Sequence, residues 1–222
     1  RISAQKHRGF VAVPVDAEPG RYPIRITVGG QMVDAAITVQ ERIFDKSELT
    51  VSRKFTKKRS AKLKRRLRRE RKAIQALWDK SPTPPKTMGP WTKPVDSEVT
   101  GVFGTRRVFN GKTKSRHYGL DLDGSTGDPI YAALDGRVVM NSMRWGSGGT
   151  IALDHGTGLF TMYFHMSKRR PRRGISVKSG DLIGAVGKSG RVTGPHLHLA
   201  VVVRARYARG ERAGKTRSLY GA

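Results

Sequence analysis

Apolar and polar residues alternate along positions 10–44, most clearly at Ile24, Ile26 and Val28. The turn sequences EPG and VGGQ separate the alternating runs. A period of two between turn residues predicts short β-strands, and about three or four of them fit this stretch. That is few for an independent sandwich. We therefore expect residues 1–50 to form a small β domain or a fragment of one, with a truncated immunoglobulin-like domain as one interpretation.

The period becomes helical farther along the chain, where the recurring apolar residues are Leu63, Leu67, Ile74, Leu77 and Trp78. The surrounding positions are strongly basic: residues 53–72 hold thirteen Lys and Arg and one acidic residue, Glu70. This pattern predicts a basic amphipathic helix over residues 51–80. Two interpretations remain open. The apolar residues pack the helix on a neighbouring domain, or the charges dock it on a polyanion.

Two further changes in pattern divide the rest of the chain. Residues 79–94 contain five prolines, which predicts an extended linker over 81–94. From residue 95 onward, glycines separate short apolar runs such as GRVVMN and LFTMYFHMS, with almost no helical period. That pattern predicts an all-β, antiparallel domain over 95–208, followed by a basic tail over 209–222. The expected fold class is therefore mainly β.

The net charge of the chain indicates what kind of partner it binds. The 222 residues include 44 Lys and Arg against 17 Asp and Glu, a net charge of +27. Such a charge implies an anionic partner: nucleic acid, an anionic membrane or an acidic cell-wall polymer. The absence of cysteine excludes disulfides, thiolate metal sites and cysteine nucleophiles. No apolar run approaches the roughly 18 residues of a membrane-spanning helix.

Candidate chemistry is concentrated in a few histidines, of which the chain has six. The stretch GPHLH places His196 and His198 two residues apart on a predicted strand, so both point to one face. Such a pair suits either a metal site or a pair of hydrogen-bonded core histidines. In HYGLD, His117 and Asp121 also share a face, and Gly119 leaves space between them. An imidazole and a carboxylate are common zinc ligands.

A third element, YFHMS, completes a set that resembles a known family. HYGLD, YFHMS and GPHLH, in this order and at these distances, are similar to the motifs of lysostaphin-type (LytM-like) zinc metallopeptidases, which cut peptidoglycan peptides. The surrounding sequences GDPIYAALDGRVV and VKSGDLIGAVGKSGRVTGPHLHLAV fit as well. The resemblance covers about residues 95–203 and implies a LytM-like antiparallel sheet or partial barrel.

The resemblance also implies roles for individual residues. His117, Asp121 and His198 would bind one zinc ion, and His165 and His196 would act on the attacking water rather than hold metal. Which of these two is the general base stays open. Arg106, Asn110 and Tyr163 are candidate groove residues, although a plain surface role suits Arg106 equally well. We expect His155 to be a turn residue, because Gly156 and Gly158, which follow it, mark a hairpin tip.

The expected function is a zinc endopeptidase that cuts peptide cross-links of peptidoglycan, with the D-Ala–diaminopimelate bond favoured. It would be exported to the periplasm or cell envelope and could also bind anionic envelope polymers through the basic helix. The alternative is a non-catalytic module that binds cell wall or activates another hydrolase. Nucleic acid is not favoured, because no nucleic-acid-binding motif accompanies the charge.

Overall fold

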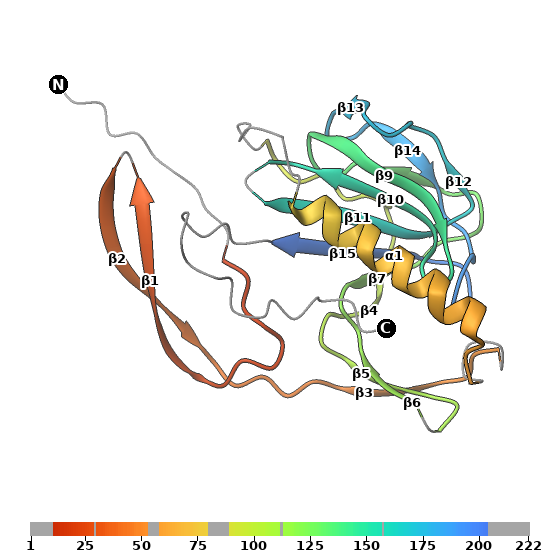
Figure 1. Cartoon of the computed structure of the whole chain (residues 1–222), viewed down its shortest axis with the longest axis horizontal. Helices are drawn as coiled ribbons and strands as arrows, with labels where there is room; N and C mark the ends of the chain where they lie inside the picture. Colours follow the sequence, from red (N-terminus) through yellow and green to blue (C-terminus); the bar gives the residue numbers. More distant parts are fainter. Residues whose placement is uncertain are drawn as a thin grey trace.

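The computed structural model describes residues 11–28, 30–52, 58–79, 89–111, 113–156 and 158–203 (Figure 1). It confirms the mainly β prediction, with antiparallel sheets that do not close into a barrel. Most strands belong to the C-terminal half. The elements are β1 Gly20–Val28, β2 Gln31–Val39, β3 Lys46–Leu49, α1 Ala61–Asp79, β4 Val99–Gly101, β5 Arg106–Phe109, β6 Thr113–Arg116, β7 Leu120–Leu122, β8 Pro129–Tyr131, β9 Gly136–Arg144, β10 Gly148–Asp154, β11 Leu159–Met166, β12 Lys168–Arg169, β13 Ser176–Val177, β14 Leu182–Ala185 and β15 Leu197–Val203.

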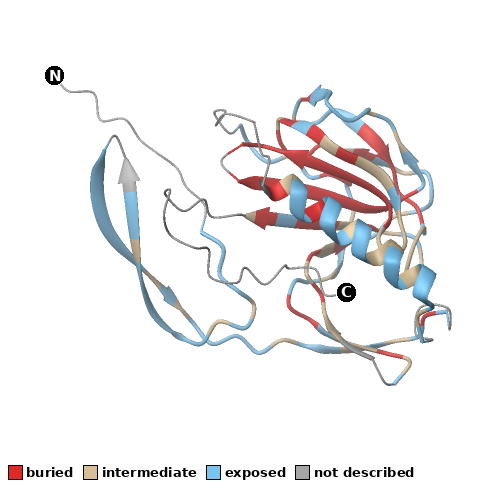
Figure 2. Ribbon diagram, in the orientation of Figure 1, coloured by how far each residue is buried: buried red, intermediate tan, exposed pale blue. Residues whose placement is uncertain are grey.

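The alternating N-terminal stretch forms a β-hairpin that projects from the rest of the molecule (Figure 1). β1 and β2 pair antiparallel from Gly20 opposite Val39 to Val28 opposite Gln31. Most of their side chains are exposed, as Figure 2 shows. The next strand, β3, does not extend this hairpin. It pairs in parallel with β5 and so joins the sheet β3-β5-β6 of the C-terminal half.

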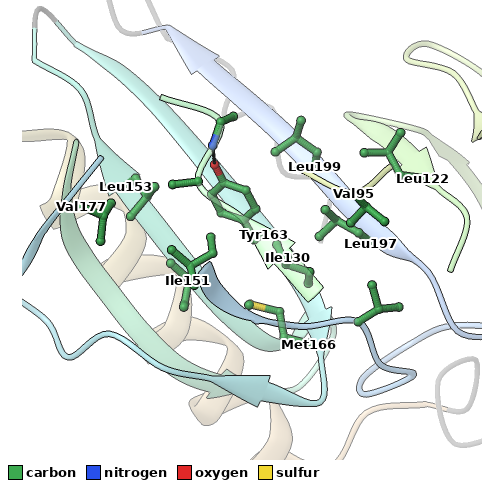
Figure 3. Close-up of a cluster of buried hydrophobic side chains, with 14 of the residues drawn as sticks. Val95, Leu122, Ile130, Ile151, Leu153, Tyr163, Met166, Val177, Leu197 and Leu199 are labelled. Carbon is green, nitrogen blue, oxygen red and sulfur yellow. Dashed lines mark hydrogen bonds between the residues drawn. The ribbon is translucent and has the colours of Figure 1, made fainter. Parts of the chain in front are cut away.

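The centre of the molecule is an antiparallel sheet with strand order β13-β9-β10-β11-β15-β7-β4. The described side chains of β10 and β11 are buried along both strands, so both faces of the sheet are covered (Figure 2). On one face, Ile151, Leu153 and Tyr163 pack in a cluster with residues that include Ile130 of β8 and Ile183 of β14 (Figure 3). This core holds the strands that carry the histidine motifs.

Helix α1 covers the other face of the same sheet (Figure 1). Ile74 and Trp78 are buried in a second cluster with Phe160, Met162 and other residues, and the Trp78 and Phe160 rings meet edge to face at 4.6 Å. Burying two such side chains stabilises the docked helix by about 1.5–3 kcal/mol each. The apolar residues of α1 therefore pack the helix on the neighbouring sheet, as one of the two interpretations expected. The polar face of α1 remains exposed.

The helix begins later than the sequence pattern suggested. Ser60 is its N-cap residue, because its hydroxyl accepts a hydrogen bond from the Leu63 amide at 3.2 Å. Residues 58–60 are not helical, and 53–57 lie outside the described part of the chain. The helix is too polar to cross a membrane, and no other described segment forms one that could.

The ends of the predicted linker and tail are only partly described. Thr92 donates its amide to Ala133, and Pro94 accepts from the Tyr131 amide, so residues 92–94 already belong to the sheet region. Residues 80–88 and the tail 209–222 lie outside the described residues. The domain boundaries expected from the sequence stay predictions.

Candidate metal centre and cleft

Strand pairing brings together the three residues expected to hold metal. β7 and β15 pair antiparallel with His198 directly opposite Asp121, and His117 precedes β7. Asp121 Oδ1 lies 2.9 Å from His117 Nε2 and 2.8 Å from His198 Nδ1, and these two nitrogens are 3.0 Å apart. In a tetrahedral zinc site each ligand atom lies roughly 2.0–2.2 Å from the metal. The ligand atoms of such a site are then only slightly farther from one another than these three atoms are. The triangle fits one metal ion.

Hydrogen bonding sets the tautomer of His117 for such a role. Its Nδ1 lies 2.8 Å from the carbonyl oxygen of Val102, which only accepts, so Nδ1 carries the proton. Nε2 therefore faces Asp121 and His198 and is the atom that would bind a metal ion. A backbone carbonyl behind a histidine ligand is the usual arrangement around protein-bound metals. The donor set thus matches a metal chemically as well as in distance.

Gly119 makes the room that His198 needs. A Cβ atom at this position would lie 2.4 Å from His198 Nε2 and 2.6 Å from the carbonyl oxygen of Leu199. Neither distance is compatible with a side chain. The space expected at Gly119 from the sequence is therefore filled by the imidazole of the partner motif.

Asp121 is held in its ionised form. Burial alone would raise the pKa of this carboxyl, but hydrogen bonding to His117 and His198 outweighs burial and holds the pKa well below its ordinary range. Its second oxygen, Oδ2, accepts a hydrogen bond from Arg107 Nη2. The sequence pattern did not indicate Arg107; its predicted groove residue was the neighbouring Arg106.

His165 and His196 lie beside the triangle without joining it. The two rings are 5.0 Å apart between centroids. His165 has a φ of 64°, which is rare outside glycine and is typical of positions under functional constraint. Its Nδ1 lies 2.8 Å from the Ser189 carbonyl oxygen, and His196 Nδ1 lies 3.1 Å from that of Gly194. In both rings Nδ1 is therefore engaged by a backbone carbonyl, which leaves Nε2 as the atom available to other groups.

The three candidate groove residues lie elsewhere. Arg106 is exposed on β5. Asn110 binds the backbone of Val51 through both of its amide atoms, at 2.8 and 3.0 Å. Tyr163 is fully buried in the core, where its hydroxyl accepts from the Ala133 amide at 2.8 Å (Figure 3). None of them lines the cavities described below.

His155 lies in the turn between β10 and β11, where the sequence placed it, but its side chain is buried. Nδ1 lies 2.7 Å from the Asp135 carbonyl oxygen, and Nε2 lies 2.8 Å from the Thr161 hydroxyl. Burial lowers the pKa of this imidazole. His155 therefore ties the turn to the core as a neutral group.

Two hollows meet at the histidine cluster. One, of about 230 Å³, lies between α1 and the sheet and is lined by His117, His165 and His198. The other, of about 330 Å³, is lined by Asp121 and His196. Both hollows border the candidate metal centre, and we refer to the two together as the cleft. Arg107, Phe109 and Arg191 line both hollows.

Helix α1 supplies one wall of this cleft. Leu67, Glu70 and Ile74 line the first hollow. Glu70 accepts hydrogen bonds from the Trp145 amide at 3.2 and 3.3 Å, and it pairs with Arg66 at 2.8 Å. The one acidic residue of the basic stretch therefore fixes the helix beside the cleft. In the sequence, the only sign of this role is that Glu70 is the one acidic residue among the basic residues 53–72.

Comparisons with known proteins agree on one family. The profile of Peptidase family M23 matches residues 115–209. Over 116 residues the chain is 39% identical to peptidoglycan DD-endopeptidase ShyA of Vibrio cholerae, a match that covers 51% of this chain and 27% of ShyA. Over 104 residues it is 35% identical to DD-carboxypeptidase/endopeptidase Mpg of Neisseria meningitidis, which covers 47% of this chain and 24% of Mpg. The chain thus spans about a quarter of the length of these relatives.

Solved structures give the same result. A crystal structure described as a putative peptidase M23 from Pseudomonas aeruginosa superimposes with a TM-score of 0.65 and 26% identity, over 86% of this chain and 71% of that one. A zinc-containing peptidase from Vibrio cholerae gives a TM-score of 0.50 and 31% identity, over 52% of this chain and 37% of the other. The first match extends well beyond residues 115–209.

Proposed function

We propose that this chain, whose residues 115–209 match Peptidase family M23, is a zinc-dependent endopeptidase of bacterial peptidoglycan. Its favoured bond is the D-Ala–diaminopimelate cross-link, and its place is the periplasm or cell envelope. The observation that carries the proposal is the triangle of His117, Asp121 and His198, whose donor atoms converge within 3.0 Å beside an open cleft. Peptidoglycan is favoured because relatives bear the name peptidoglycan DD-endopeptidase.

The triangle would hold the zinc ion. When bound, zinc polarises the scissile carbonyl and lowers the pKa of water toward about 7. Arg107 keeps the outer oxygen of Asp121 occupied, so this carboxylate presents only Oδ1 to the metal. The carbonyl of Val102 holds His117 in the matching tautomer.

His165 and His196 would act on the reacting atoms rather than on the metal. Burial, and after it the neighbouring His196 and His198, lower the pKa of His165 to about 3. The ring is therefore neutral at neutral pH, and its Nε2 can accept a proton from the attacking water. His196, which immediately precedes β15, offers its own Nε2 beside the His165 ring. Either ring, once protonated, can donate a hydrogen bond to the oxyanion of the tetrahedral state.

The experiment uses the purified chain with zinc and sacculi of the diaminopimelate type. We expect cross-linked muropeptide dimers to be converted to monomers, as read by mass spectrometry, and we expect a chelator to stop the conversion. His117→Ala should lose stoichiometric zinc. His165→Ala and His196→Ala should keep it and lose turnover by about 10²–10⁴-fold.

Two results would contradict the proposal. Zinc that stays bound without His117, Asp121 and His198 would exclude the ligand assignment. Sacculi that bind the zinc-loaded chain without any cleavage would instead favour a binding or hydrolase-activating module. Monomers that arise by cleavage of another bond would contradict only the assignment of the D-Ala–diaminopimelate bond and would leave the zinc endopeptidase proposal in place.

A further inference from the structure

Arg191 lies in the cleft without a carboxylate partner. It follows β14, and its guanidinium lies over the Phe109 ring at 4.8 Å. The side chain is half-buried and lines both hollows of the cleft. Among the described residues, none brings a carboxylate within ion-pair distance of Arg191. By contrast, Arg107 pairs with Asp121.

The backbone around Arg191 is fixed in place. Its amide donates to the Gly146 carbonyl at 2.7 Å. The preceding Gly190 has a φ of +87°, and a Cβ there would lie 2.4 Å from the same Gly146 oxygen. Ser189, one residue earlier, accepts from His165 Nδ1. Arg191 is therefore presented by the same rigid loop that orients His165.

Arg59 approaches the same cavity from the α1 side. It immediately precedes the N-cap of the helix, and its guanidinium lies over the Trp145 ring at 5.8 Å. The Trp145 amide is in turn held by Glu70 of α1. Arg59 and Arg191 both line the first hollow. Within the part of the chain that the structure describes, Arg59 also has no carboxylate within ion-pair distance.

Two cations that lie in one cleft without an anion raise the free energy of the folded state. Burial lowers the pKa of Arg191, and the charges of Arg59 and Arg107 lower it further. A partly desolvated cation beside like charges destabilises the fold unless an anion joins it. Charged groups left in this state inside a cleft are candidates for ligand binding.

We infer that Arg59 and Arg191 form a subsite for a carboxylate of the peptide substrate, next to the metal centre. This inference rests on the proposed function, since the stem peptides of peptidoglycan carry free carboxylates. The planar guanidinium matches a carboxylate through two parallel hydrogen bonds, which a lysine cannot reproduce. Arg191 presents this fork from the loop whose Ser189 carbonyl orients His165, and Arg59 adds charge from the α1 side of the first hollow. The subsite therefore selects substrates with a free carboxylate over amidated ones.

The test compares two uncleavable stem-peptide analogues that differ only in having free or amidated carboxylates. Binding to the full zinc-loaded chain is measured by calorimetry. We expect the wild type to bind the free acid at least about tenfold more tightly than the amide. Arg191→Gln should remove most of this preference and leave affinity for the amide unchanged. Arg59→Gln should reduce the preference, and Arg191→Lys should restore only part of it.

The matched control is Arg68→Gln, an exposed α1 residue that lines neither hollow. It removes the same charge and should keep the full preference. Equal affinity of the wild type for both peptides would overturn the subsite, and so would a preference that survives Arg191→Gln. Sacculus cleavage is measured separately. A chain that prefers the free acid but cleaves nothing would keep the subsite and refute the endopeptidase.

Discussion

At the scale of single residues, the metal site depends on the missing side chain at Gly119 as well as on the side chains that contact the ligands. The His198 imidazole occupies the space where Gly119 would carry a side chain, and Arg107 takes the outer oxygen of Asp121. His165 adopts a left-handed backbone conformation that a carbonyl partner on its ring supports. The ligand triangle is therefore pre-organised by its neighbours, which is the usual condition for tight metal binding.

Gly119→Ala tests this pre-organisation. The new Cβ would lie 2.4 Å from His198 Nε2 and 2.6 Å from the Leu199 carbonyl oxygen, so the His198 ring and the adjoining backbone of β15 must shift. We expect zinc affinity to fall by about 10–100-fold, as happens when the support of a ligand is lost, while the fold persists. Competition with a chelating dye measures the affinity. Gly194→Ala is the control, because a Cβ there meets nothing within 4 Å; equal loss in both variants would show that the effect is not specific to His198.

At the scale of elements, α1 has two faces with different tasks. Its apolar residues cover the sheet face opposite the main core, and Glu70 fixes it beside the cleft. The remaining surface is a band of exposed Lys and Arg. Packing thus explains the position of α1 on the sheet, but it does not explain the basic charge of its exposed surface. Attraction to anionic envelope polymers is the role we propose for that charge.

Replacing six exposed residues of α1 with Gln tests the role of the charge; they are Lys62, Lys64, Arg65, Arg68, Arg69 and Lys72. Exposed charges act over about 8–10 Å at physiological salt, so they should affect association far more than the chemical step. We expect weaker and less salt-sensitive binding to intact sacculi, with an unchanged rate on a short soluble peptide.

The control removes six exposed charges elsewhere, namely Lys93, Arg137, Lys168, Arg170, Arg172 and Arg173. If both variants lose the same affinity, net charge rather than the helix governs binding. If neither loses any, the helix is only structural and the polymer-binding proposal fails.

At the scale of the whole molecule, the buried neutral histidines couple stability to pH. Burial lowers the pKa of His155 below its ordinary value of 6.5. The unfolded chain therefore takes up a proton more readily than the folded one. The stabilising contribution is complete above about pH 6.5 and is lost as pH falls toward the lowered pKa, at up to about 1.4 kcal/mol per pH unit.

We expect the metal-free protein to lose thermal stability between pH 7.5 and 5, and His155→Gln to lose less over the same interval. His165 and His198, whose pKa values burial also lowers, contribute the part that remains. Scanning calorimetry at several pH values measures both curves. Parallel curves for the two proteins would show that His155 does not titrate with unfolding.

The sequence by itself determined the features that depend on local spacing. Strand alternation predicted a mainly β chain, and the helical period predicted α1 through Ile74 and Trp78. The i, i+2 and i, i+4 spacings were enough to put His198, His117 and Asp121 on common faces. The resemblance supplied their roles, which stay predictions until metal binding is measured.

Only the tertiary structure decided the features that depend on which elements meet. Arg106 and Arg107 point to opposite faces of β5, and only the contact of Arg107 with Asp121 shows which face meets the site. Tyr163 points into the core because β11 is covered on both faces. Arg59 and Arg191 are 132 positions apart in the sequence, and the docking of α1 brings them to one cleft. Local patterns assign a side chain to a face, but long-range packing decides what that face contacts.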